Sequence, residues 1–429
     1  MSKVTENPRG NCVLGGINAV LGAIDRACPI FHAGPGCCMQ TSAGESGQAG
    51  GKTPFFVSSV SIPSSNMLEK EVVFGGENKL RSTIQGTIEV IDAKAYFVLT
   101  GCTAGIIGDD IVSVVDEFRA KGHPIYAIET PGFAGNSDYG YETVFKVFLD
   151  QIVEKGRPKQ KNLVNLLGII PNHDPFWSGN FEELTRILNK LGLEVNTFFT
   201  QHQGMDEIKN SGAAALNIIV NPWLLKDAAE QYEAEFAVPS LRIEGLPIGA
   251  TDTTDFIRQI AAALDLDTVR VEAVIAEEEE EYVYNYLETA IGALSWKRFA
   301  IVGDSNMAIG LTRYLANDYS FTPLLTIITE PMFREEDKER IKNRLTSLEY
   351  AKPPQVLFES DQYHIAKALA ENEEITLLIG STNEREIGLQ KDIQCSVISF
   401  PITDRLIFNR TYAGYRGSLT LTEDLYDNL

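Results

Sequence analysis

The sequence predicts an α/β protein in which parallel sheets are covered by helices on both faces. Short apolar runs alternate with amphipathic helices, which is typical of parallel sheets, and this alternation restarts twice along the chain. In the first unit, residues 93–102 (AKAYFVLTGC) form an apolar run that ends in small residues. Residues 103–122 then carry apolar side chains at helical spacing up to Gly122, and residues 123–133 resume as a strand.

The same pattern begins again near Lys161 and near Lys297. The sequence therefore predicts three tandem Rossmann-like domains, at residues 1–160, 161–290 and 291–429. Their boundaries fall in a polar, basic segment and near the acidic run at residues 277–281. We expect this run to be the solvated start of a helix, where negative charge suits the helix dipole, rather than a docking site.

The composition narrows the class of protein. The chain has 429 residues, of which 44% are hydrophobic, and a net charge of −22, so it can bury a large core and would repel nucleic acids and anionic membranes. No apolar stretch reaches the roughly 18 residues that span a bilayer, and the polar N-terminus lacks the apolar region of a signal peptide. Six cysteines are too few for a secreted disulfide scaffold. We expect a cytoplasmic protein.

Four common kinds of site are poorly supported. Residues 303–310 (GDSNMAIG) follow a strand and open a helix, but they lack the G-x-G-x-x-G spacing of a dinucleotide site, so we interpret them as a tightly packed turn. The sequence contains no phosphate-binding loop of the G-x-x-x-x-G-K-[ST] type, so any ATP would be hydrolysed by another protein. Neither the G-x-S-x-G motif of hydrolases nor the usual zinc motifs occur.

The cysteines fall into two groups. We expect Cys28, late in a helical run, and Cys395, at the start of a strand, to be small buried hydrophobic residues. Cys12, Cys37 and Cys102 instead lie where regular elements meet glycine-rich turns, in GNCVLGG, GPGCCMQ and LTGCTAG. Small neighbours let a backbone approach a metal–sulfur cluster, and a helix N-terminus favours thiolate. These three are candidate cluster ligands, with a structural role as the alternative.

Six stretches resemble the nitrogenase component 1 superfamily: NPRGNCVLGG, HAGPGC, EKEVVFGGENKL, LTGCTAGIIGDDI, ETPGFAGNSDYGY and FPITDRLIFNRTYAGYRGSL. They extend from one end of the chain to the other and agree with three α/β domains. The superfamily includes the molybdenum–iron, vanadium–iron and iron-only proteins and a cofactor-assembly scaffold pair. It also includes the dark-operative protochlorophyllide and chlorophyllide reductases and methylthio-alkane reductases.

The resemblance implies a set of site residues in a cluster-binding N-terminal domain. The metal ligands would be Cys12, Cys37 and Cys102, which would hold one subunit's share of an interfacial iron–sulfur cluster of the 4Fe-4S or 8Fe-7S type. The cluster's surroundings would include Gly36, Glu69, Gly101 and Gly132. Cys38 would be an extra thiol beside a ligand. We expect the loop at residues 40–67 to line or cover the cluster, and Glu69 and residues 108–110 to brace this region.

The resemblance also distinguishes two subunit types. The α-type subunits of true nitrogenases bind a catalytic cofactor through a cysteine after the third strand of the middle domain, where this chain has Asn221. The C-terminal FPITDR stretch resembles β-type subunits, and no cofactor-binding histidine is found there. The chain therefore resembles a β-type subunit without a substrate-reducing cofactor. Gly132 departs from the β-type nitrogenase pattern, which has a serine at this position.

The implied function is electron relay in an oxidoreductase. The resemblance implies an α2β2 complex with an α-type paralogue, in which electrons from an ATP-dependent iron–sulfur reductase dimer pass through the shared cluster to a site in the partner. No catalytic acid or base is assigned to this chain. A cofactor-assembly scaffold subunit is the first alternative. A non-enzymatic α/β metal-binding protein with structural cysteines is the second.

Overall fold

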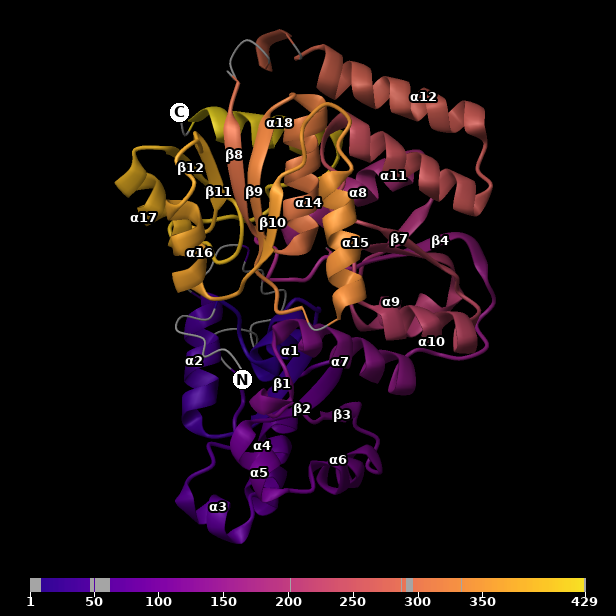
Figure 1. Cartoon of the computed structure of the whole chain (residues 1–429). Coiled ribbons are helices and arrows are strands. Elements are labelled where there is room, and N and C mark those ends of the chain that lie inside the picture. The colour runs from indigo at the N-terminus through magenta and orange to yellow at the C-terminus, as the bar shows by residue number, and fades with distance from the viewer. Residues whose placement is uncertain are drawn as a thin grey trace.

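The computed structural model describes residues 9–46, 50, 62–200, 202–286, 288–290, 296–332 and 334–427. It contains three sheets, and every strand pair in them is parallel. Figure 1 shows the N-terminal unit at the bottom, the C-terminal unit at the upper left and the middle unit on the right. The fold class predicted from the sequence, α/β with parallel sheets flanked by helices, is confirmed.

The first sheet has the strand order β1-β2-β3. Its strands are β1 (Ala27–His32), β2 (Ala95–Thr100) and β3 (Ile125–Ile128). The helices of this unit are α1 (Val13–Gly22), α2 (Pro35–Ser46), α3 (Glu69–Phe74), α4 (Glu77–Val90), α5 (Cys102–Ile107), α6 (Ile111–Arg119) and α7 (Ser137–Gln151). All six residues of β2 are buried because helices cover both faces of the sheet.

The second sheet has the strand order β5-β4-β6-β7. Its strands are β4 (Gln160–Leu167), β5 (Glu194–Asn196), β6 (Ala214–Val220) and β7 (Ser240–Ile243). Its helices are α8 (Trp177–Lys190), α9 (Met205–Asn210), α10 (Lys226–Phe236), α11 (Gly249–Leu264) and α12 (Thr268–Glu279).

The third sheet has the order β10-β9-β8-β11-β12, with its first strand in the middle, as in doubly wound folds. Its strands are β8 (Arg298–Gly303), β9 (Thr322–Ile328), β10 (Gln355–Phe358), β11 (Leu377–Gly380) and β12 (Gln394–Val397). Its helices are α14 (Ser305–Arg313), α15 (Glu335–Thr346), α16 (Gln362–Ala370), α17 (Thr382–Lys391) and α18 (Gly414–Asp427). Residues 303–310 form the tight β8–α14 turn that the sequence predicts, capped by Asp304.

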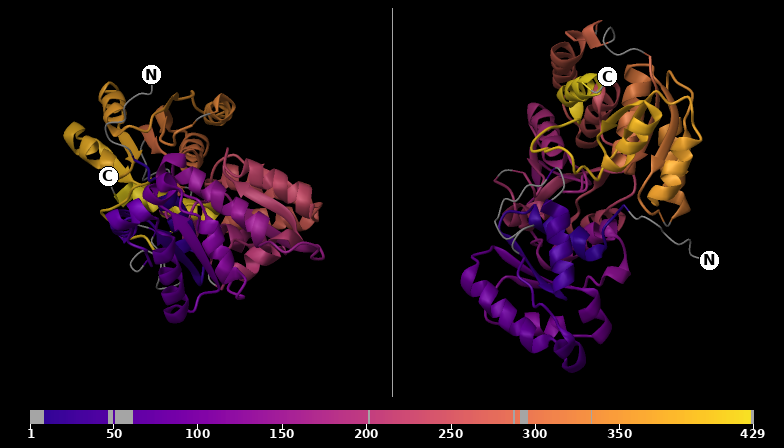
Figure 2. Two further views of the ribbon diagram at one scale, coloured as in Figure 1. Left: turned by 90° about the horizontal axis from the view of Figure 1, so that it is seen from below. Right: turned by 90° about the vertical axis from the view of Figure 1, so that its left-hand side faces the viewer.

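The three units share one hydrophobic core. A single cluster of buried residues contains Leu99 of β2, Leu166 of β4 and Ile379 of β11. The C-terminal helix α18 packs against α11 and α8 of the middle unit, and the right-hand view in Figure 2 shows it away from the N-terminal unit. The boundaries at residues 160/161 and 290/291 stay a prediction. Within the described residues, no helix is long and apolar enough to cross a membrane.

Two sequence-based assignments of secondary structure are wrong. The single helix predicted over residues 103–122 is two helices, because Gly108 adopts a left-handed conformation (φ 74°) that ends α5. The Asp110 side chain then accepts a hydrogen bond from the backbone N–H of Ser113 and caps α6. Cys28 lies in strand β1 rather than in a helix, although its predicted burial is confirmed.

The acidic run at residues 277–281 is not the solvated start of a helix. It forms the C-terminal end of α12 and continues into a π-helical turn at Glu280–Tyr284. The Glu278 side chain is fully buried, and its carboxylate accepts hydrogen bonds from Arg186, with a shortest N···O distance of 2.5 Å. Lys190 makes a further ion pair with Glu278 at 2.5 Å. These two cations from α8 compensate a negative charge that the helix dipole alone would disfavour at this end.

The close packing of α1 on α7 gives a stability test. A Cβ atom at Gly16 would lie 2.4 Å from the backbone oxygen of Ser137, so Gly16→Ala should destabilise the protein by about 1–3 kcal/mol through overpacking. A Cβ atom at Gly86, inside α4, would meet no atom within 4 Å, so Gly86→Ala should instead stabilise by roughly 0.5–1 kcal/mol. Chemical denaturation of both variants measures the change in the free energy of unfolding, which should have opposite signs. Equal changes would contradict the close packing of α1 on α7.

Candidate metal centre

Cys12 and Cys102 meet at Gly132. Cys12 is the N-cap of α1, Cys102 is the first residue of α5, and Gly132 opens the 3-10 turn Gly132–Ala134 that follows β3. The backbone N–H of Gly132 donates a hydrogen bond to Cys102 Sγ at 3.2 Å. A Cβ atom at position 132 would lie 3.0 Å from Cys102 Sγ and 3.4 Å from Cys12 Sγ. Glycine therefore lets this turn lie between the two sulfur atoms.

The backbone around Cys12 is held by the start of α7. Cys12 forms an isolated antiparallel bridge with Asn136. The N–H of Val13 donates to the oxygen of Gly135 at 3.3 Å, and the N–H of Ser137 donates to the oxygen of Asn11 at 3.0 Å. The thiol itself is exposed. These bonds fix the main chain while leaving the sulfur atom at the surface.

Cys37 completes the group from the first turn of α2. Burial raises the pKa of the Cys37 thiol, and the neighbouring charges of Cys102 and Cys12 raise it further. β1 and β2 are neighbours, with His32 beside Thr100, so the turns that follow them and carry Cys37 and Cys102 leave the same edge of the sheet. The structure therefore brings together the three cysteines that the sequence singles out, from three separate elements.

Three cysteine thiols are the donor type that iron–sulfur clusters take. Among the described residues, no group of three or more His, Cys, Asp or Glu side chains could hold one metal ion. Iron–sulfur clusters are bound by cysteine thiolates, and each iron takes its own thiolate, so their ligands are spaced more widely. The N–H bond from Gly132 to Cys102 Sγ is of the kind that tunes such clusters.

The other three cysteines have different surroundings. Cys38 donates a weak hydrogen bond to the oxygen of Ile62 (3.6 Å), and burial raises its pKa. Burial raises the pKa of Cys28 and of Cys395 to about 12, because the thiolate form would lose its hydration. Cys28 belongs to the core beneath α4 and α6, and Cys395 packs against the core of the third sheet.

The predicted glycines and Glu69 differ in their surroundings. A Cβ atom at Gly101 would lie 2.6 Å from the Cβ atom of Ala33, so glycine is needed where β1 and β2 end side by side. A Cβ atom at Gly36 would meet nothing within 4 Å, so this chain imposes no steric demand there. Glu69 is exposed in the first turn of α3, and within the described residues no hydrogen bond or ion pair joins it to the cysteines.

The brace behind this region is built on His32 and Asp109. His32 Nε2 lies 2.8 Å from Asp109 Oδ2, and His32 Nδ1 lies 3.0 Å from Ser65 Oγ. Asp109 also accepts the N–H of Gly76 at 3.0 Å, which ties α4 to the α5–α6 turn. Burial lowers the pKa of His32 despite the nearby carboxylate. His32 was recognisable in the sequence only as part of HAGPGC, without a partner.

The segment at residues 40–67 is partly regular. Helix α2 extends to Ser46, so the predicted loop begins later than expected. Residues 47–49 and 51–61 lie outside the described part of the chain. Residues 62–67 run beside β1, where the N–H of Phe31 donates to the oxygen of Pro63 at 2.8 Å and Met67 donates to Ala33 at 2.9 Å.

Exposed apolar side chains lie on the elements that carry the thiols and on neighbouring segments. Met39 on α2, Ile106 on α5 and Phe133 beside Gly132 are 76%, 74% and 65% exposed, and Phe74 on α3 is 81% exposed. Apolar side chains this exposed, two of them on the helices that carry Cys37 and Cys102, are typical of a protein–protein contact surface. The thiols thus lie at a surface suited to a partner rather than in a closed pocket.

A second polar site is a cavity of about 270 Å³ lined by residues of all three units. Asp138, Asp304 and Glu330 line it. Burial raises the pKa of all three carboxyl groups, and the neighbouring Asp304 contributes to the shift of the other two. Each also serves a helix N-terminus or its cap: Asp304 accepts the N–H of Met307 at 2.9 Å. No cysteine lines this cavity within the described residues.

Asn221, at the position where α-type subunits carry the cofactor cysteine, is buried after β6. Its Oδ1 accepts hydrogen bonds from the N–H groups of Trp223 and Leu224, at 3.1 and 3.0 Å, and its Nδ2 donates to the oxygen of Gly168 at 3.3 Å. Both ends of the amide are therefore used in shaping the turn after the strand.

The buried carboxyls predict a pH dependence of stability. Burial raises the pKa of Asp138 to about 7, so the folded state holds a proton that the unfolded chain releases near pH 4. This stabilising contribution is complete at low pH and is lost as the pH rises through about 7. Each such carboxyl contributes a slope of at most about 1.4 kcal/mol per pH unit. His173, whose pKa is lowered to about 4, acts in the opposite direction below pH 6.5.

Asp138→Asn isolates this effect. We expect the variant to lose part of the decline in unfolding free energy between about pH 4 and 7, and to gain stability relative to the wild type at pH 8. Urea denaturation at each pH measures this difference. Parallel curves for the two proteins would show that Asp138 is ionised in the folded state.

The comparisons with known proteins identify the class and then the family. The fold is that of a nitrogenase component: the structure "Nitrogenase Cp1 at pH 6.5" superimposes with a TM-score of 0.81 and 20% identity, covering 100% of this chain and 94% of that chain. Residues 12–429 match the family described as nitrogenase component 1 type oxidoreductase, and the chain belongs to this family.

The curated relatives include both catalytic and biosynthetic proteins. The iron-molybdenum cofactor biosynthesis protein NifE of Clostridium pasteurianum is 26% identical over 385 residues, which cover 89% of this chain and 80% of that protein. The nitrogenase molybdenum-iron protein beta chain of Frankia alni is 24% identical over 454 residues, covering 99% and 83%. The alpha chain of the C. pasteurianum molybdenum-iron protein is 30% identical over 278 residues, covering 63% and 50%.

Proposed function

We propose that this chain is a β-type subunit of a nitrogenase-like oxidoreductase and holds one half of an interfacial iron–sulfur cluster. The observation that carries this proposal is the meeting of Cys12, Cys37 and Cys102, from three elements, at a surface with exposed apolar side chains. A site with three thiols on one side and an apolar rim suits completion by a second subunit. When bound, the cluster would supply reversible electron transfer, and its type, 4Fe-4S or 8Fe-7S, is left open.

This chain's own residues bind the cluster and tune its redox potential. The three thiolates bind iron, and the N–H of Gly132 donates to one of the ligand sulfurs. The apolar rim excludes water once a partner covers it. No side chain of this subunit is assigned acid–base work.

The cavity lined by all three units supports the absence of a second cofactor here. No cysteine lines it within the described residues, and Asn221, at the position of the cofactor cysteine of α-type subunits, is committed to backbone hydrogen bonds. The site of substrate reduction is therefore assigned to the partner, an α-type paralogue in an α2β2 complex. The electron donor is an ATP-dependent iron–sulfur reductase dimer, and the compartment is the cytoplasm.

A scaffold for cofactor assembly is the second candidate. The similarity to the biosynthesis protein NifE, over 89% of this chain, favours it, and the same thiol site would serve both functions. The two candidates differ in turnover. An electron-relay subunit supports substrate reduction when the complex is mixed with the reductase and ATP. A scaffold transfers a cofactor to an apo-protein without such turnover.

The ligand assignment is tested by anaerobic co-purification with the partner, followed by iron quantitation and EPR. Cys37→Ala should abolish the cluster signal, because it removes one of the three thiolates proposed to bind iron. Cys395→Ala is the matched control, since its thiol packs in the core of the third sheet, and it should retain the wild-type signal.

Two results would contradict the proposal in different ways. Full iron content in both variants would show that the ligands are assigned wrongly. A colourless, iron-free wild-type complex would favour the α/β metal-binding protein with structural cysteines, and would overturn electron relay altogether.

A further inference from the structure

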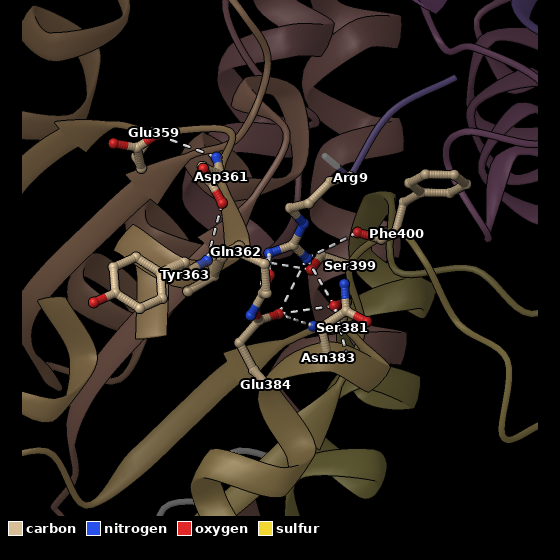
Figure 3. Close-up of polar contacts among 11 residues, drawn as sticks. Arg9, Glu359, Asp361, Gln362, Tyr363, Ser381, Asn383, Glu384, Ser399 and Phe400 are labelled. Carbon is tan, nitrogen blue, oxygen red and sulfur yellow. Dashed lines mark hydrogen bonds and ion pairs between the residues drawn. The ribbon is translucent and has the colours of Figure 1, made fainter. Parts of the chain in front are cut away.

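Arg9, three residues before Cys12, inserts its side chain into the C-terminal unit. Figure 3 shows the guanidinium among residues of the third unit, in contact with Glu384, Ser381 and Phe400. Its Nη1 donates to Glu384 Oε1 at 2.9 Å and its Nη2 to Glu384 Oε2 at 3.0 Å, which is a bidentate pair. Nη2 also donates to Ser381 Oγ at 2.7 Å and to the oxygen of Phe400 at 3.1 Å.

This ion pair is buried and its carboxylate is fully bonded. The Arg9 side chain is 4% exposed, and that of Glu384 is not exposed at all. Glu384 accepts further hydrogen bonds from the N–H of Ser381 at 2.8 Å and from Gln362 Nε2 at 2.7 Å, as part of the capping box of α17. Every oxygen of the carboxylate is bonded, although Arg9 Nε has no partner, and the pair is costly to break because removal of either charge leaves the other unpaired in the interior.

The segment that joins Arg9 to Cys12 is short. Only Gly10 and Asn11 separate the two residues, and Asn11 is itself bound to Ser137 at 3.0 Å. The main chain at Cys12 is therefore fixed from two sides: by α7 of its own unit and by Arg9 in the C-terminal unit, more than 370 positions away in sequence at Glu384. A shift of the C-terminal unit would be transmitted to the exposed thiol.

We propose that the Arg9–Glu384 pair is a positioning clamp through which the C-terminal unit sets the location of the Cys12 sulfur. The inference rests on the proposed function, because it treats Cys12 as a cluster ligand. It assigns Arg9 and Glu384 no contact with the cluster. Their effect passes through the four-residue segment that ends in Cys12. Interactions that orient metal ligands from outside typically change metal affinity about 10-fold to 100-fold.

The chain offers a matched control in Arg313 and Asp252. Arg313 on α14 donates from Nε and Nη2 to Asp252 on α11 at 2.7–3.0 Å, and the side chains are 7% and 8% exposed. This pair also joins two units and is similarly buried, but no cysteine lies near either residue in sequence. Loss of either ion pair should lower the stability of the protein by a comparable amount. Only loss of the Arg9–Glu384 pair should disturb the cluster.

The experiment compares Arg9→Gln, Glu384→Gln, the double variant and Arg313→Gln in the anaerobically purified complex with its partner subunit. For each, one measures the thermal midpoint, the EPR spectrum and the concentration of a ferrous chelator, bathophenanthroline disulfonate, that removes half of the iron. We expect this concentration to fall about 10-fold to 100-fold in the two single variants, with an altered EPR line shape. The double variant should be no worse than either single one, because both remove the same contact.

Arg9→Lys keeps the folded protein testable if the glutamine variants do not assemble. Lysine retains the charge but cannot form the planar two-bond contact, so we expect a near-wild-type thermal midpoint with an altered EPR line shape. Wild-type chelator resistance and EPR in the Arg9 variants would overturn the inference and leave the proposed function intact. Equal iron loss in Arg313→Gln would also overturn it. An iron-free wild-type complex would overturn the proposed function first.

Discussion

In a parallel sheet every strand ends at the same edge, and the candidate metal centre depends on this constraint. β1 and β2 are in register so that His32 lies beside Thr100, and Leu99 of β2 lies beside Ile128 of β3. The segments that follow these three strands must therefore leave the sheet together. They carry Cys37, Cys102 and Gly132, which are far apart in the sequence. The sheet's register, rather than any local motif, makes them neighbours.

The close approach of these segments demands small residues at two points. Gly101 lets the end of β2 pack against Ala33, and Gly132 lets the turn after β3 pass between two sulfur atoms. Cys12 joins the same edge from outside the sheet, held by the bridge to Asn136. The site is thus built from rigid elements, which is what a centre with little tolerance for displaced ligands requires.

The same edge geometry explains the contrasting cavity. Helix N-termini that follow parallel strands commonly bind anions. Here the chain supplies its own carboxyl groups at this place, including Asp304 at the start of α14 and Glu330, which accepts the hydroxyl of Ser305 at 2.9 Å. The helix ends are satisfied internally, and the cavity is left acidic rather than receptive to an anion. The same fold therefore holds two different sites, one with thiols at the surface and one with buried carboxyl groups in a cavity.

The sequence alone determined the fold class and the composition of the thiol site. Alternating buried strands and amphipathic helices specify parallel sheets because their period is local, and cysteines beside glycine-rich turns stand out without any coordinates. Local signals gave two wrong predictions. Gly108 divides one expected helix into two. Residues 277–281 end a helix rather than begin one, because Arg186 and Lys190, about 90 positions away, neutralise Glu278.

Only the tertiary structure decided which residues meet. The pairing of His32 with Asp109 and of Arg9 with Glu384 joins residues 77 and 375 positions apart, and nothing in either local sequence reveals its partner. Burial is what gives these contacts their strength, since a charge or a polar ring removed from water must find a complementary group. Burial is a property of the packed chain, so these contacts became visible only when the three units were seen together.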